Sequence, residues 1–202
     1  SKLKAEPWEE IDMLSKREFL KAVVGLTTLV GTYSSLAKEA TQFPMKRTAI
    51  VYYSHSGNTR TVASRLSALT AVPVFEIVPQ TPYPNAYRPT TNQVREEMQK
   101  GYLPPIHTPS IDLNNFDILI IGTPTWWHHI ARPVASWLSQ TDLSGKVIMP
   151  FNTHGGGGLM QTRDDFVQMC PKSTVTQSLT IYGSGDSDLD EQILRWLKQV
   201  NL

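Results

Sequence analysis

The sequence predicts one α/β domain built around a parallel sheet. From residue 45 onward, short apolar runs of strand length alternate with segments in which apolar residues recur at helical spacing. This alternation is typical of βαβ units, whose helices cover both faces of a parallel sheet. A chain of 202 residues is long enough for one well-packed domain of this kind.

Five segments have the composition of strands. The run from Thr48 to Tyr53 is continuously apolar, as expected for a central parallel strand buried on both faces. The run from Phe116 to Gly122 is the third predicted strand. The predicted strands are residues 48–53, 74–78, 116–122, 147–151 and 174–181.

Five segments between and after these strands have helical periodicity. The first carries an apolar stripe from Val62 to Leu69, and Pro133 suits the first turn of the third. The second is polar and is expected to stop before Gly101. Residues 79–89 contain four prolines and are predicted to be a loop. The predicted helices are residues 59–70, 91–100, 133–140, 159–169 and 188–200.

Composition excludes several classes of function. The chain has 19 Lys and Arg against 18 Asp and Glu, which gives no basic field for a nucleic-acid groove. A single cysteine, Cys170, rules out an intramolecular disulfide and any metal site with several cysteines. In a doubly wound sheet, ligands bind where the strands end, so the loops after the first, third and fourth predicted strands are candidate binding loops.

The first of these loops has the character of a phosphate site. A helix begins directly after it, and the free N–H groups and partial positive charge of a helix start can hold an anion. A glycine lets the backbone approach closely, and hydroxyls add donors. The alternative is a plain turn in which Asn58 or Ser56 caps the helix. The loop lacks the lysine of a nucleotide-hydrolase P-loop, so a monophosphate is expected rather than a triphosphate with magnesium. Its candidate binding residues are Ser54, His55, Ser56, Gly57, Asn58 and Thr59.

The second loop presents two adjacent tryptophans at the end of a buried strand. Together they can offer a flat, π-rich surface, although one or both could instead pack in the core. Its candidate residues are Pro124, Thr125, Trp126 and Trp127. His128 and His129 follow, but no nearby carboxylate completes a metal shell with His154, so no metal site is predicted.

The third loop runs into four consecutive glycines, which expose backbone N–H and C=O groups. Such a groove suits the edge of a planar heterocycle, and the alternative is a flexible connection. Its candidate residues are Thr153, His154, Gly155 and Gly156. The three loops together predict one ligand, a monophosphate that carries a large flat ring.

Three motifs in order resemble a known family. Residues 49–63, AIVYYSHSGNTRTVA, resemble the flavodoxin signature, and residues 121–138 and 143–158 resemble a bacterial subgroup of flavodoxin-like proteins. The resemblance spans residues 45–202. It implies a three-layer fold with a five-stranded parallel sheet in the order 2-1-3-4-5 and non-covalently bound FMN. It also implies that residues 54–59 hold the FMN phosphate, that residues 124–127 flank the isoalloxazine, and that residues 153–156 line its other edge. Where the subgroup usually has small residues after the tryptophans, this chain has two histidines.

Two functions fit a bound FMN. The first is an electron-transfer flavoprotein that works between redox partners, either a protein or a small molecule. The alternative is a reductase that takes hydride from NAD(P)H and reduces quinones or similar acceptors, with His128, His129, Tyr83 or Tyr87 lining the open flavin face. No residue is singled out as catalytic. A phosphatase of similar architecture would need a cysteine in the first loop, where none occurs.

Residues 1–44 have a different composition and form a predicted leader. The segment SKREFLK, residues 15–21, precedes an apolar run and resembles a twin-arginine export signal, with Lys16 in place of the first arginine. The run is shorter than the roughly 20 residues of a membrane span. Export from the cytoplasm is expected, and the alternative is a cytoplasmic protein with an uncleaved N-terminal helix.

Overall fold

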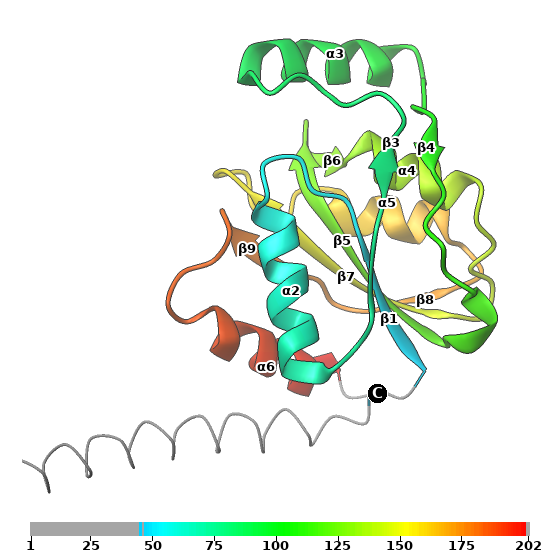
Figure 1. Ribbon diagram of the computed structural model, residues 1–202, viewed down its shortest axis with the longest axis vertical. Coiled ribbons are helices and arrows are strands. Elements are labelled where there is room, and N and C mark those ends of the chain that lie inside the picture. The colour runs from blue at the N-terminus through cyan, green and yellow to red at the C-terminus, as the bar shows by residue number, and fades with distance from the viewer. Residues whose placement is uncertain (1–44, 46, 201–202) are drawn as a thin grey trace, which may run out of the picture. The chain divides into compact units, whose positions relative to one another are not determined.

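The structure is a computed structural model that describes residues 45 and 47–200 (Figure 1). The predicted leader, residues 1–44, lies outside the described residues. The described residues belong to one compact unit. Among them, no helix combines the length and apolar character that crossing a bilayer requires.

A parallel sheet forms the centre of the domain. Its strands pair in the order β2-β1-β5-β7, and β8 and β9 both pair with β7. Counting the predicted strands in chain order, this is the arrangement 2-1-3-4-5, so the predicted fold is confirmed. The strands are β1 (Thr48–Tyr52), β2 (Val74–Glu76), β5 (Ile118–Trp126), β7 (Val147–His154), β8 (Thr174–Val175) and β9 (Leu179–Tyr182).

The predicted fifth strand, residues 174–181, is interrupted and becomes β8 and β9. At the break, the backbone carbonyls accept hydrogen bonds from side chains instead of from a neighbouring strand. The Arg163 guanidinium donates to the carbonyls of Val175 and Thr176, at 3.0 and 2.9 Å. The Trp196 indole N–H donates to the carbonyl of Gln177 at 2.9 Å.

Two helices cover each face of the sheet. Side chains of a strand point alternately to opposite faces, so each strand contributes to two cores. Ala49 and Val51 face a core shared with α4 (Arg132–Ser139) and α5 (Thr162–Met169). Ile50 and Tyr52 face a second core, shared with α2 (Asn58–Thr70) and α6 (Leu189–Val200). The predicted three-layer architecture is therefore present (Figure 1).

The crossover between β2 and β5 contains more structure than the sequence predicted. The predicted loop 79–89 is wrong at both ends. Its first residue pairs in a two-stranded ribbon of β3 (Val78–Pro79) and β4 (Ile106–His107), and α3 (Tyr87–Gln99) starts four residues before the predicted position. Pro89 is compatible with the early start because the first turn of a helix needs no N–H donors. A short 3-10 helix, η1 (Leu113–Asn115), precedes β5.

Helix α3 lies beyond the carboxyl ends of the strands instead of flat against the sheet (Figure 1). Val94 anchors it to the core on the α4 and α5 side. This position brings the start of α3 to the edge of the sheet where ligands are expected.

The contact between β5 and β7 requires a glycine at position 122. Gly122 and Phe151 are partners in the ladder, and the buried Phe151 ring occupies the space above the glycine. A Cβ atom on Gly122 would lie 2.1 Å from the ring Cζ atom. The two central strands can therefore pair in this register only if residue 122 has no side chain.

We predict that Gly122→Ala lowers the free energy of unfolding by about 3 kcal/mol, near the upper end of the usual cost of overpacking a core. Denaturant unfolding followed by circular dichroism measures it. Gly155→Ala is the matched control, because a Cβ there meets no atom within 4 Å. Equal stability of the two variants would contradict this account of the strand contact.

Candidate functional site

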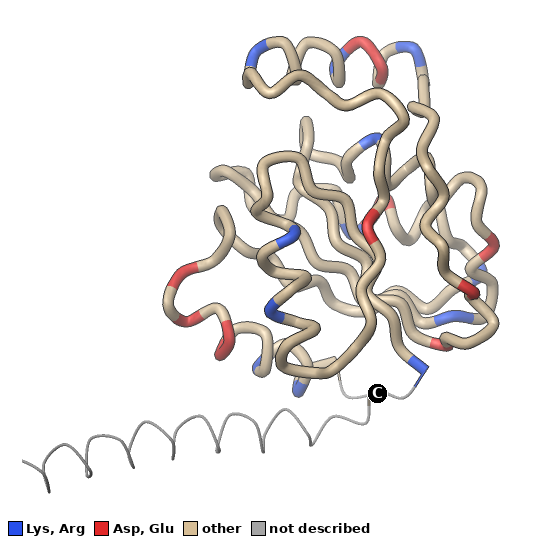
Figure 2. The backbone as a smooth tube through the Cα atoms, viewed as in Figure 1, with Lys and Arg blue, Asp and Glu red and all other residues tan. Residues whose placement is uncertain are grey.

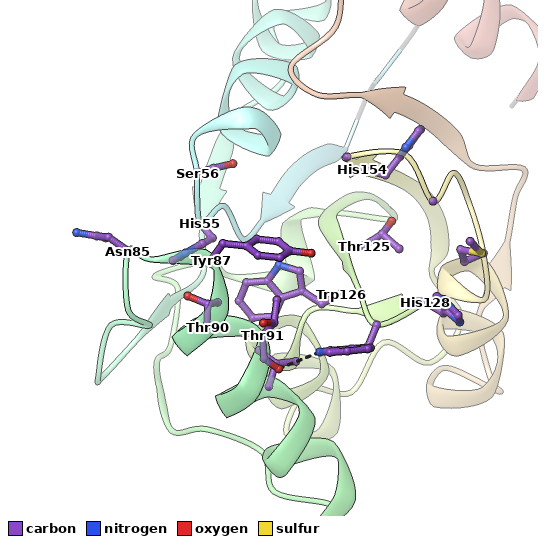
Figure 3. Close-up of a pocket in the computed structure, with 15 residues that line it drawn as sticks. His55, Ser56, Asn85, Tyr87, Thr90, Thr91, Thr125, Trp126, His128 and His154 are labelled. Carbon is purple, nitrogen blue, oxygen red and sulfur yellow. Dashed lines mark hydrogen bonds between the residues drawn. The ribbon is translucent and has the colours of Figure 1, made fainter.

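A cavity of about 420 Å³ opens where the parallel strands end (Figure 3). It is bordered by the loops after β1, β5 and β7 and by the start of α3. The size is within the range of small-molecule and cofactor pockets. The lining residues are His55, Ser56, Asn85, Tyr87, Thr90, Thr91, Val94, Thr125, Trp126, Trp127, His128, His154, Gly155, Gly157 and Met160.

The loop after β1 leaves the start of α2 open to an anion. Gly57 precedes the helix in the left-handed region with φ 96°, a conformation that favours glycine. No side chain of the described residues caps this helix, so the predicted alternative of a plain turn capped by Asn58 or Ser56 is wrong. The Ser54 hydroxyl instead accepts the Gly57 N–H at 3.2 Å. The first N–H groups of α2 thus remain available at the positive end of its dipole.

A buried hydroxyl pair joins the first and third loops. Thr59 in the first turn of α2 and Thr153 in β7 are both buried, and their Oγ1 atoms lie 2.8 Å apart. This hydrogen bond fixes the start of α2 against the end of β7. The loop after β1 and the glycine-rich loop after β7 are therefore held at a fixed distance from each other.

Trp126 forms one wall of the cavity and is supported from behind by aromatic rings. Tyr83 and Tyr53 meet it edge-on, with ring centroids 4.9 and 5.5 Å away, and His55 does so at 5.8 Å. Edge-to-face contacts of this kind are favourable for aromatic rings. Trp126 is half-buried, so part of its surface faces the cavity.

Trp127 is held by α3. Its indole N–H donates to the carbonyl of Thr91 at 3.0 Å, drawn dashed in Figure 3. The Arg95 guanidinium lies over its ring, 4.4 Å from the centroid. The tandem tryptophans thus have separate supports, and the expectation that both could pack in the core is wrong for Trp127, which is 41% exposed.

The chain turns sharply after Trp126. Trp127 and His128 are the two central residues of a hairpin between β5 and β6 (His129–Ile130), and both have positive φ, 48° and 73°. Such turns favour Asn-Gly, and each bulky residue held in this region costs about 1–3 kcal/mol. The His128 carbonyl accepts the Gln161 N–H at 2.9 Å, which helps to hold the strained turn.

The two histidines of the hairpin have different surroundings. His128 lines the cavity, whereas His129 points to α5. The Nδ1 atom of His129 lies 2.9 Å from Oδ1 of Asp165, and Oδ2 of Asp165 accepts the Ile130 N–H at 2.9 Å. The Asp165 carboxylate thereby fastens β6 to α5. In the described part of the chain, no group of three His, Cys, Asp or Glu side chains is placed to hold a metal ion.

The glycine-rich loop after β7 is tied to the loop after β5. The Asn152 amide donates to the Thr125 hydroxyl at 2.8 Å and to the Gly158 carbonyl at 3.1 Å. The Gly156 N–H donates to Nδ1 of His154 at 3.0 Å, so this N–H is paired within the loop. Gly155 and Gly157 line the cavity.

The predicted site residues divide into two groups. Several line the cavity directly, and the others shape the loops that border it. Those that line it are His55, Ser56, Thr125, Trp126, Trp127, His154 and Gly155. Those that border it without lining it are Ser54, Gly57, Asn58, Thr59, Pro124, Thr153 and Gly156.

One wall of the cavity, which we call the α3 wall, was not predicted from the sequence. It comprises Asn85, Tyr87, Thr90, Thr91 and Val94, of which only Tyr87 had been considered. The four prolines of residues 79–89 led to the prediction of a loop there, so the start of α3 was not recognised as part of a binding site. The signal that could have revealed it is an aromatic residue, Tyr87, at the start of a polar helix.

A buried carboxylate supports the aromatic wall from the far end of α3. Glu97 is 6% exposed, and its oxygens accept the Tyr83 hydroxyl at 2.6 Å and the Gln93 amide at 2.9 Å. Burial raises the pKa of Tyr83 far above its usual value, and the hydrogen bond to Glu97 raises it further. Tyr83 therefore stays protonated and donates to Glu97, which fixes the ring against Trp126.

We predict that Glu97→Ala lowers the free energy of unfolding by about 2–3 kcal/mol, because the buried Tyr83 hydroxyl and Gln93 amide lose their acceptor. Glu97→Gln keeps an acceptor and should cost less. Glu96→Ala, which removes an exposed carboxylate on the same helix, should cost less than about 0.5 kcal/mol. Denaturant unfolding measures all three, and equal effects of the two alanine variants would contradict a supporting role for Glu97.

The fold and cavity together define a protein that binds a flat ring and an anionic group at the ends of parallel strands. Residues 47–200 match the family described as Flavodoxin, which is most of the chain. The protein therefore belongs to the flavodoxin family.

Solved structures show the same fold. A putative flavoprotein from Bacteroides eggerthii is 22% identical with a TM-score of 0.68, and the match covers 78% of this chain and 99% of that one. A flavoprotein from Lactobacillus acidophilus, in complex with FMN, is 24% identical with a TM-score of 0.59, and the match covers 73% of this chain and 98% of that one.

FMN is the cofactor of this family and of this chain, and the residues present fit it. The uncapped start of α2 and the hydroxyl of Ser56 suit the phosphate. Trp126 and Trp127 offer aromatic surface to the ring, and Gly155 and Gly157 leave room for its edge. These residues are the ones that would hold FMN.

Proposed function

We propose that this protein is an electron-transfer flavoprotein that works between redox partners. The observation that carries the proposal is the joint placement of an aromatic-walled cavity and an uncapped helix start at the ends of one sheet. Bound FMN supplies reversible uptake of electrons. The residues of the chain bind the ring, orient it and keep water from it.

The surroundings of the ring are expected to lower its reduction potential. Among the described residues that line the cavity there is no Lys or Arg, and a cation there would favour a negatively charged reduced ring. Figure 2 shows the charged residues of α3 and α6 along these helices. Aromatic surface and the lack of Lys and Arg among the described lining residues both disfavour added negative charge.

The cavity contains no thiol for covalent chemistry. Cys170 is buried and is not among the lining residues. Burial raises the pKa of its thiol to about 11, so it stays protonated near neutral pH. Cys170 is therefore not a nucleophile of this cavity.

A second candidate is a reductase with a small-molecule acceptor. It is supported by Tyr87 and His128, which line the cavity as the sequence analysis expected for such an enzyme. The other two residues considered there are placed differently. Tyr83 is buried behind Trp126, and His129 is paired with Asp165.

We predict that the protein binds FMN at least about 100-fold more tightly than riboflavin, which lacks the phosphate. Two charge-assisted hydrogen bonds at about 1.5 kcal/mol each account for this ratio. Titration of flavin-free protein, followed by quenching of flavin fluorescence, measures both affinities. Ser56→Ala should weaken FMN several-fold and leave riboflavin unchanged.

Equal affinity for the two flavins would show that no phosphate site exists at α2. A lack of flavin absorbance, together with no uptake of added FMN, would rule out the proposed function altogether. Stopped-flow mixing of the FMN-loaded protein with NADH and NADPH separates the two candidates, because only the reductase takes hydride from them.

We also propose that residues 1–44 direct export through a twin-arginine translocase. The proposal is supported by the SKREFLK segment and the apolar run that follows it. A fusion of residues 1–44 to a reporter should leave the cytoplasm only in cells with that translocase. Arg17→Lys should abolish export, and Lys4→Arg, outside the segment, should not. Export that persists without the translocase would contradict the proposal.

A further inference from the structure

We propose that His154 positions the glycine-rich loop of the cavity only while its ring is unprotonated, so that acid releases the loop and weakens flavin binding. The proposal rests on the proposed function, because this loop is assigned to the edge of FMN, and it adds a dependence on pH to that site. Three features carry it: one hydrogen bond, the sparse packing of the loop and the low charge of the cavity.

A hydrogen bond determines the protonation state of the His154 ring. The Gly156 N–H donates to Nδ1 of His154 at 3.0 Å. A backbone N–H can only donate, so Nδ1 has a free lone pair and the neutral ring carries its proton on Nε2. A proton from solvent would occupy the same lone pair. The loop is therefore held while the ring is neutral, and it is released as the pH falls and the ring is protonated.

The ring links a fixed strand end to a loosely packed loop. His154 is the last residue of β7, and its carbonyl accepts the Gly183 N–H at 2.9 Å. Its ring meets Tyr182 of β9 edge-on, with centroids 5.7 Å apart. Beyond it, a Cβ at Gly155 or Gly156 would meet no atom within 4 Å. The start of the loop, which leaves the strand beside the cavity (Figure 3), thus depends strongly on the bond to His154.

The far end of the loop is held by groups that do not titrate. The Gly158 carbonyl accepts the Asn152 amide at 3.1 Å and the Thr125 hydroxyl at 3.4 Å. Amides and hydroxyls of this kind keep their protonation state between pH 5 and 8. Acid therefore frees Gly155 and Gly156 at the start of the loop, while Gly158 stays in place.

The cavity has little charge that would fix the protonation state of His154. The side chain that meets its ring from β9 is Tyr182, and tyrosine is ordinarily uncharged below a pH of about 10. The other titratable groups that line the cavity are His55, His128 and Tyr87, and none of the described lining residues is Asp, Glu, Lys or Arg. Histidine side chains ordinarily change charge between pH 5 and 8, so this is the range to test.

The test measures the affinity of the flavin-free full chain for riboflavin at pH 8 and at pH 5.5, by quenching of flavin fluorescence. Riboflavin is uncharged and has no phosphate that titrates in this range. His154→Asn is the informative variant, because an asparagine oxygen accepts an N–H two residues on and does not titrate. The ratio of affinities, pH 8 to pH 5.5, should be about 3- to 10-fold larger for the wild type than for this variant, as expected for loss of one hydrogen bond.

Two further variants complete the comparison. His154→Ala has no acceptor at either pH, so its ratio should be as small as that of His154→Asn. His107→Asn is the matched control: His107 is an exposed histidine of β4 that does not line the cavity, so this variant should keep the wild-type ratio. Equal ratios in the wild type and His154→Asn overturn the proposal, while FMN binding and the proposed function stand.

Nitrogen-15 NMR of the flavin-free chain tests the hydrogen bond itself, whatever the affinity for riboflavin. At pH 8, Nδ1 of His154 should be unprotonated and Nε2 protonated, and the Gly156 amide signal should shift as the ring titrates. A proton on Nδ1 at pH 8, or a Gly156 signal that does not follow the titration, overturns the proposal. Failure of the wild-type chain to bind FMN at pH 8 overturns the proposed function and, with it, this role of His154.

Discussion

The strained hairpin between β5 and β6 is the constraint on which the site depends. Trp127 and His128 occupy a backbone region that disfavours bulky residues, and several contacts from outside the hairpin oppose the strain. Helix α3 holds Trp127, Gln161 just before α5 holds the His128 carbonyl, and Asp165 in α5 holds the strand that follows. Trp127 and the turn that follows Trp126 therefore keep their place at the cavity through contacts with α3 and with the start of α5.

Hydrogen bonds among the strand ends join the three loops into one site. The Thr59 and Thr153 hydroxyls connect the first loop to the third, and Asn152 connects the third to the second. Asn152 and Thr153 lie at the carboxyl end of β7, and Thr59 lies in the first turn of the helix that follows β1. The strand order therefore decides which loops can meet, and side-chain polarity decides how firmly they are joined.

Much of the fold was predictable because its signals are local. The buried run that ends at Tyr52 and the glycine before α2 are visible within a few residues. The supports of the tryptophans are not local: the Trp127 indole bonds to a backbone carbonyl 36 residues away, and backbone atoms leave no mark on sequence composition. The start of α3 was missed because prolines usually indicate loops.

The link between Trp127 and α3 also bears on the kinetics of the cofactor. One indole hydrogen bond and one stacked guanidinium couple the loop beside the flavin to a helix that lies over the sheet edge. Because Tyr87, Thr91 and Trp127 line the cavity, opening of this unit would release a ring bound there, and such local opening is slower than side-chain motion. The residence time of FMN would then be set by the opening of α3 rather than by the strength of the phosphate contacts alone.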